Sequence, residues 1–223
     1  MPWREGLEGT ALAIASSGSR KIRVMAGPGT GKSRGMMRRI ARLLSEGHDP
    51  RRILAVTFTR NAADSLKDDL RAIGVTGCDD IKATTLHGLC FSILNRAAVF
   101  AYHGRHPRPL MVFEERAMLQ DLKSSFGGIS ACEKMILAFG AAWAKLQNDA
   151  PGWPQEAEER RFRDAFIAWL RFHHAIHLDE LIPLALDFLR NNPEASERSA
   201  YDHVVVDEYQ DLNKAEQMLI SLL

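Results

Sequence analysis

Residues 26–33 read Ala26-Gly27-Pro28-Gly29-Thr30-Gly31-Lys32-Ser33, and this stretch decides how the fold is interpreted. Its glycines allow successive backbone N–H groups to face inward and surround phosphate oxygens. Lys32 can reach the β- and γ-phosphates of a nucleotide, and the Ser33 hydroxyl can ligate Mg²⁺. The stretch therefore predicts a P-loop that binds ATP and Mg²⁺, although the strict pattern begins with Gly where this chain has Ala26. The alternative is a glycine-rich turn that contains a lysine by chance.

The segments on either side of this loop have the order that a phosphate-binding loop requires. Residues 21–26 (KIRVMA) predict a short buried strand before the loop. Residues 33–44 predict a helix after it, with Met36, Ile40 and Leu43 on one apolar face. The N-terminus of such a helix adds its dipole and its free amide groups to a phosphate site.

A second chemical signal is the segment 204–211, which reads VVVDEYQD. Asp207 and Glu208 follow an apolar strand, and in open α/β sheets the ligand lies at the carboxyl ends of the strands. A carboxylate at Asp207 can hold Mg²⁺, and one at Glu208 can orient and deprotonate a water molecule. Alone, the pair would suit a solvated acidic turn, but together with the loop it predicts a catalytic site.

The remaining sequence alternates between strand and helix and then becomes helical. Strands are expected at 21–26, 53–58, 81–86 and 203–207. Helices are expected at 33–44, 61–73, 87–98, 114–125, 130–147, 155–174, 178–190 and 214–223. The pattern predicts an α/β fold whose parallel sheet is interrupted by an all-helical insertion and is incomplete at the C-terminal end. The expected boundaries are 1–99 and 196–223 for the α/β part and 100–195 for the insertion.

Composition excludes several other classes of protein. The 223 residues are 46% hydrophobic and 26% charged, which is ordinary for a globular chain and excludes global disorder. The net charge is +1, so a site for a polyanion must be local. Three cysteines and the lack of an apolar span or signal sequence predict a cytoplasmic protein without a disulfide framework or membrane segment.

Four motifs in this order resemble the N-terminal part of superfamily 1 DNA helicases of the UvrD/Rep type. They are AGPGTGKS, LAVTFTRNAADSLKDDL, TLHGLC and VVVDEYQDLN. The resemblance covers essentially the whole chain. It implies a RecA-like motor domain that hydrolyses ATP and moves 3′ to 5′ along single-stranded DNA, separating duplex DNA in the intact protein.

The resemblance also implies roles for individual residues. Lys32 and Ser33 would bind phosphate and Mg²⁺, Asp207 would be the metal ligand, Glu208 the general base, and Gln210 a sensor of the γ-phosphate. The residues implied on the DNA path are Thr57, Phe58, Thr59, Asn61, Thr85 and His87. Hydroxyl, amide and imidazole groups can hydrogen-bond phosphate, and a ring such as that of Phe58 either stacks on a base or packs in the core.

Two departures from the family pattern limit these expectations. Residues 7–15 contain no counterpart of the glutamine that reads adenine, so strict selectivity for ATP is not predicted. The second RecA-like domain, which supplies arginines to the γ-phosphate, is also missing from the sequence, so we expect weak nucleotide binding and negligible unwinding from this chain alone. A non-catalytic module that binds DNA or protein, and the motor part of a helicase–nuclease subunit, remain alternatives. A small-molecule kinase is disfavoured because it has no use for TLHG or VVVDEYQD.

Two other groups of residues each allow two interpretations. His173 and His177 have the i, i+4 spacing of a zinc site, but solvated or capping histidines are the usual case. The segment 160–172 interleaves arginines with aromatic residues, as nucleic-acid-binding segments do. Its helical spacing favours instead a core face that carries Phe162, Phe166 and Trp169.

Overall fold

The computed structural model describes residues 2–25, 27, 29–147 and 152–223. The chain forms two compact units. One comprises Met1–Leu86, Ser199–Gln210 and Leu223, and we call it the sheet unit. The other comprises His87–Arg198 and Asp211–Leu222, and we call it the helical unit. Within the described part of the chain, no helix has the length and apolar character needed to cross a bilayer.

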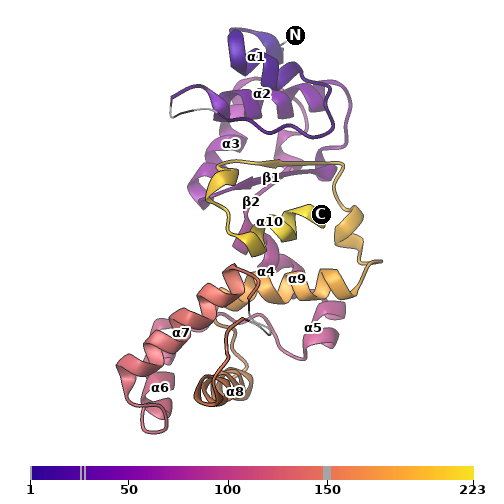
Figure 1. Ribbon diagram of the computed structural model, residues 1–223. Helices are drawn as coiled ribbons and strands as arrows, with labels where there is room; N and C mark the ends of the chain where they lie inside the picture. The colour runs from indigo at the N-terminus through magenta and orange to yellow at the C-terminus, as the bar shows by residue number, and fades with distance from the viewer. Residues whose placement is uncertain (1, 26, 28, 148–151) are drawn as a thin grey trace. The chain divides into compact units, whose positions relative to one another are not determined.

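Among the described residues the sheet unit contains three parallel strands, which correspond to three of the four strands that the sequence predicts (Figure 1). They are β1 (Ile53–Thr57), β2 (Lys82–Thr85) and β3 (His203–Val206), in the order β2-β1-β3. Ala55 of β1 is in register with Ala83 on one side and with Val205 on the other. Every residue of β1 is buried, which is typical of a central parallel strand covered on both faces.

Three helices complete this unit: α1 (Gly9–Ser16), α2 (Lys32–Ser45) and α3 (Arg60–Ala72). The expected helix at 33–44 is thus confirmed as α2, whose Ile40, Ala41 and Leu43 are buried in the same core as Leu70 of α3. The Thr59 hydroxyl accepts a hydrogen bond from the Ala62 amide and caps the start of α3. The sequence pattern does not predict α1, a short helix that packs on α2.

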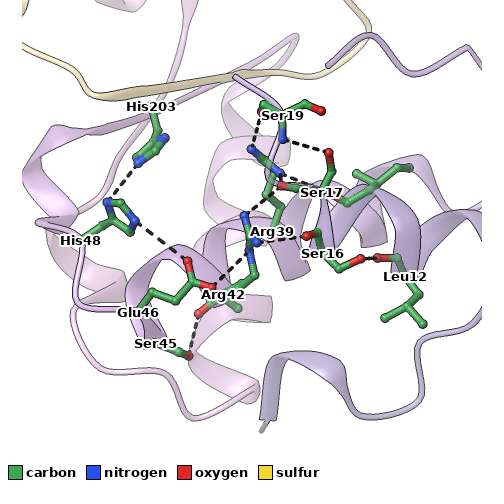
Figure 2. Close-up of polar contacts among 12 residues, drawn as sticks. Leu12, Ser16, Ser17, Ser19, Arg39, Arg42, Ser45, Glu46, His48 and His203 are labelled. Carbon is green, nitrogen blue, oxygen red and sulfur yellow. Dashed lines mark hydrogen bonds and ion pairs between the residues drawn. The ribbon is translucent and has the colours of Figure 1, made fainter. Parts of the chain in front are cut away.

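The prediction of a strand at 21–26 is wrong for the residues of this range that the structure describes. Residues 22–25 are irregular, and the side chain of Met25 is 82% exposed. This segment is not part of the sheet, whose order is β2-β1-β3. The residues before it are held by α2 instead, since Arg39 donates hydrogen bonds to the carbonyl oxygens of Ser17 and Ser19 (Figure 2). A strand needs a paired neighbour as well as an apolar sequence.

The helical unit contains α4 to α10. Their bounds are α4 (Leu86–Leu94), α5 (Ala97–His103), α6 (Val112–Leu122), α7 (Ile129–Ala144), α8 (Ala157–Phe172), α9 (Leu181–Asn191) and α10 (Lys214–Ser221). The single helix expected at 87–98 is in fact two, α4 and α5. Arg96 interrupts it with an extended backbone, and its guanidinium pairs with Glu197 and bonds the Ser196 hydroxyl.

The core of the helical unit is aromatic. Phe162, Phe166 and Leu170 of α8 are fully buried and pack against α6 and α7. This confirms the interpretation of these two phenylalanines as a core face. The unit also buries an ion pair, in which the guanidinium of Arg105 lies 2.8 Å from the Glu180 carboxylate.

Candidate functional site

The glycine-rich loop ends in two left-handed glycines that lead into α2. Gly29 has φ 73° and Gly31 has φ 80°, conformations that side chains disfavour. Gly31 is the N-cap of α2, and no side chain caps the first amides of the helix. The Thr30 hydroxyl donates a hydrogen bond of 2.7 Å to the Gly27 carbonyl oxygen and closes the turn. Such an uncapped helix start can receive an anion.

Ala26 and Pro28, two of the predicted loop residues, lie outside the described residues. Ser33, the predicted magnesium ligand on this side, is the second residue of α2 and is exposed. Its hydroxyl therefore lies in the first turn of the helix, next to Lys32.

The acidic residues follow directly from β3. The Asp207 amide donates a hydrogen bond of 2.9 Å to the Val56 carbonyl oxygen and continues the ladder with β1. One Asp207 carboxylate oxygen accepts a bond of 3.1 Å from the Glu208 amide. Glu208 has φ 48°, which is unfavourable for a residue with a side chain. The sharp turn after Asp207 thus changes the chain direction at Glu208, and strain of this kind often accompanies function.

The loop and the acidic segment meet through Lys32 and Glu208. The Lys32 ammonium lies 3.6 Å from a Glu208 carboxylate oxygen, and the Gln210 side-chain amide donates a hydrogen bond to the same oxygen. The bond from Gln210 and the positive charge of Lys32 lower the pKa of Glu208. Both charged side chains remain partly exposed, at 24% and 37%, so the pair is open to a ligand from solvent.

The residues expected on a DNA path divide into two groups. Thr57 ends β1 and is buried, and its hydroxyl donates to the Thr59 carbonyl oxygen at 2.9 Å. Phe58 and Asn61 are exposed. The Phe58 ring is 69% exposed, so the interpretation of this ring as a core residue is wrong.

The second group lies at the end of β2 and at the start of α4. Thr85 is the last residue of β2, and His87 is the second residue of α4, in the helical unit. The carboxyl ends of β1 and β2 lie at one edge of the sheet because the strands are parallel and in register. Thr57 and Thr85 are direct register partners at this edge.

Sequence reasoning did not anticipate one feature of the site, the left-handed backbone of Glu208. A glycine or asparagine usually marks such a position, but the segment after β3 contains neither until Asn213. The hydrogen bond between Gln210 and Glu208 depends on this turn and could not be deduced from spacing.

The sheet unit is an α/β fold that brings a lysine-bearing loop and an acidic strand end together at one site. Comparison with known proteins assigns the chain to a family. The model of the UvrD/REP helicase N-terminal domain matches residues 8–223. The chain therefore belongs to the UvrD/REP helicase family.

Two curated relatives are DNA helicases by name. The chain is 30% identical to the ATP-dependent DNA helicase PcrA of Bacillus subtilis (strain 168) over 216 residues, which cover 90% of this chain and 29% of that protein. It is 28% identical over 213 residues to PcrA of Staphylococcus aureus (strain Mu50 / ATCC 700699), with the same coverage. The chain thus spans less than a third of the length of these relatives.

Proposed function

We propose that this chain is the ATP-binding part of a DNA helicase or translocase whose motor is a RecA-like domain. The observation that carries the proposal is the approach of Lys32 to Glu208 across the carboxyl edge of the sheet. In this proposal residues 1–99 and 196–223 form the motor segments, and residues 100–195 form the helical insertion.

The residues would divide the chemistry between them. The amides of the loop and of the first turn of α2 bind the phosphates, and the Lys32 ammonium balances their negative charge. A triphosphate competes with Glu208 for Lys32 and so frees the Glu208 carboxylate. Glu208 then accepts the proton of the attacking water, and Gln210, which already bonds Glu208, links this carboxylate to the γ-phosphate.

The donor set fits magnesium. Ser33 offers a hydroxyl oxygen, and Asp207 offers a carboxylate with one oxygen in a single bond to the Glu208 amide. Hard oxygen donors of this kind are the ones that Mg²⁺ prefers. When bound, the ion neutralises charge on the β- and γ-phosphate oxygens. Ser33 and Asp207 are the residues that would hold it.

Single-stranded DNA is the proposed partner of the strand ends. The exposed ring of Phe58 can stack on a base of any sequence, and Asn61, Thr85 and His87 can bond phosphate. The 3′ to 5′ direction and strand separation belong to the intact protein, together with its second RecA-like domain.

The test of the nucleotide site is Lys32→Ala. Contacts between a charged donor and phosphate contribute about 1.5–3 kcal/mol, so affinity for a fluorescent ATP analogue in the presence of Mg²⁺ should fall roughly ten- to a hundredfold. Titration followed by fluorescence anisotropy measures it.

Lys134→Ala is the matched control, since Lys134 is an exposed helical lysine of α7 and its removal changes net charge equally. Nucleotide affinity that is the same in Lys32→Ala, Lys134→Ala and the unsubstituted chain would contradict the proposed site.

A further inference from the structure

The C-terminal end of α8 presents an aromatic group that the proposed nucleotide site does not use. The Phe172 ring is 80% exposed. Its centroid lies 5.0 Å from the imidazole of His173, which in turn lies 3.8 Å from the Trp169 ring. Three rings in succession thus lie at one helix end, and we call Trp169, Phe172 and His173 the α8 platform.

Hydrogen bonds fix the backbone of this platform. His174 has φ 50° and ends the helix in the left-handed conformation. Its amide donates a hydrogen bond of 3.1 Å to the Arg171 carbonyl oxygen, and the Ala175 amide donates one of 2.9 Å to the Leu170 carbonyl oxygen. This pair of bonds is a Schellman motif. A rigid helix end of this kind presents its rings without the entropy cost of ordering a loop.

Neighbouring side chains bond the rings and the backbone of the platform. The Trp169 indole N–H donates to the Asp121 carboxylate at 2.8 Å. Arg108 donates to the His173 carbonyl oxygen at 2.8 Å and also pairs with Glu114. Arg108 balances the charge of Glu114, whereas Asp121 accepts from a neutral N–H and keeps its negative charge.

A cationic side chain comes directly before Phe172 in α8. Arg171 is exposed, and its guanidinium has no ion pair within the residues that the structure describes. An exposed ring and an unpaired cation on successive residues of one helix end suit a strand of unpaired bases joined by phosphates, because bases stack on aromatic faces and phosphates attract arginine.

Another exposed phenylalanine of the same unit lacks these features. Phe113 of α6 is 70% exposed, but Glu114 and Glu115 follow it in the chain. Exposure of an aromatic ring is therefore not what singles out Phe172. What distinguishes it is the combination of neighbouring rings, a fixed backbone and an arginine without an ion pair among the described residues.

We propose that the α8 platform binds a single nucleic-acid strand, with a base stacked on Phe172 and a phosphate bound by Arg171. This inference rests on the proposed function, in which DNA is the partner, and adds a contact in the helical unit. It also assigns a function to the exposed end of the basic and aromatic segment at 160–172, in which Phe162 and Phe166 are buried in the core.

The test measures binding of a fluorescein-labelled oligothymidine strand to the full chain by anisotropy at low salt. Phe172→Ala should weaken binding at least about fivefold, the effect of losing one base–aromatic stack. Phe172→Trp should restore it, because indole also stacks. Phe113→Ala is the matched control and should bind like the unsubstituted chain.

Two further readouts separate a stacking contact from a general effect on the fold. Arg171→Gln should reduce the salt dependence of log K by about 0.7, the value for one phosphate contact on a single strand. An oligonucleotide that carries 5-iodouracil should cross-link to Phe172 on irradiation, with the site identified by mass spectrometry.

Unchanged strand affinity in Phe172→Ala, or cross-links that all lie elsewhere, would overturn the platform. Equal loss of duplex and single-strand binding in Phe172→Ala without a cross-link would also overturn it, since a duplex does not expose base faces for stacking. The absence of strand binding by the unsubstituted chain would do the same. The Lys32→Ala nucleotide titration is independent of these outcomes, so failure of the platform and failure of the nucleotide site are distinguishable.

Discussion

At the scale of single residues, His48 and His203 form a hydrogen-bonded pair that should sense pH. Figure 2 shows the two imidazoles, whose Nδ1 (His48) and Nε2 (His203) atoms lie 3.1 Å apart. One nitrogen must donate and the other accept, so at least one ring must be neutral. Burial and the positive charges of His48, Arg39 and Arg42 lower the pKa of His203, while the charge of Asp202 opposes the change.

The lowered pKa of His203 makes the stability of the fold depend on pH. The unfolded chain binds a proton at His203 more readily than the folded chain, so the stabilisation is complete above pH 6.5, the ordinary value, and is lost as the pH falls through the lowered pKa. Loss of the pair should cost about 1 kcal/mol and lower Tm by about 2–4 °C for a chain of this size. Thermal unfolding monitored by circular dichroism from about pH 7.5 to about pH 5.5 measures it.

His48→Gln should flatten this part of the pH dependence, since it removes the imidazole that is hydrogen-bonded to His203. His174→Asn is the control, because His174 is exposed and asparagine tolerates its left-handed backbone. A pH dependence of Tm that is equally steep in His48→Gln and in the unsubstituted chain would exclude the pair as its source.

At the scale of elements, two arginines of α2 hold the end of α1 and the segment that follows it. Arg39 donates to the Ser17 carbonyl oxygen at 2.6 Å, and Arg42 donates to those of Ser16 and Ser17 at 3.1 Å (Figure 2). These are among the last carbonyl groups of α1, which an isolated helix leaves without partners. The short helix α1 therefore depends on α2 for its C-terminal end.

Arg39→Ala should release this end. Hydrogen bonds from a charged donor contribute about 1.5–3 kcal/mol, so we expect a loss of that order in the free energy of unfolding and faster amide exchange in α1. Urea unfolding and hydrogen–deuterium exchange by mass spectrometry measure the two effects. Arg51→Ala, at an exposed position in the turn before β1, is the control. If α1 exchanges at the same rate in Arg39→Ala as in the unsubstituted chain, the arginine does not anchor it.

The same elements show which parts of the fold could be predicted from sequence. The three paired strands and α2 follow local patterns of apolar residues, so their periodicity predicted them. The strand at 21–26 has the right composition but no paired neighbour, and the break between α4 and α5 depends on Glu197, which lies far along the chain. Contacts of this range cannot be deduced from local periodicity.

The candidate site divides in the same way. The glycines and Lys32 were identified because each residue type has a direct chemical reason at its position. The pairing of Lys32 with Glu208 depends on the order of the strands in the sheet. The sequence predicts the class of fold but not this order. The strained turn at Glu208 has no local signal, because the surrounding chain imposes it.

At the scale of the whole molecule, each unit has a hydrophobic core of its own. Leu70 lies fully buried in the core of the sheet unit, while Phe162 and Phe166 lie in that of the helical unit. The helical unit also buries the Arg105–Glu180 pair, whose glutamate accepts a further bond from the His177 amide. Removal of one partner from such a pair leaves an uncompensated buried charge.

Substitutions in the two cores should therefore act on separate parts of the chain. Glu180→Ala should cost about 3–5 kcal/mol and raise native-state amide exchange in α6 to α9, with little change in β1. Leu70→Ala, the reciprocal control, should cost about 2–5 kcal/mol and raise exchange in β1, α2 and α3 instead. Hydrogen exchange under native conditions resolves both patterns. Equal acceleration throughout the chain in either variant would show that the two units unfold as one, because local destabilisation would then always lead to global opening.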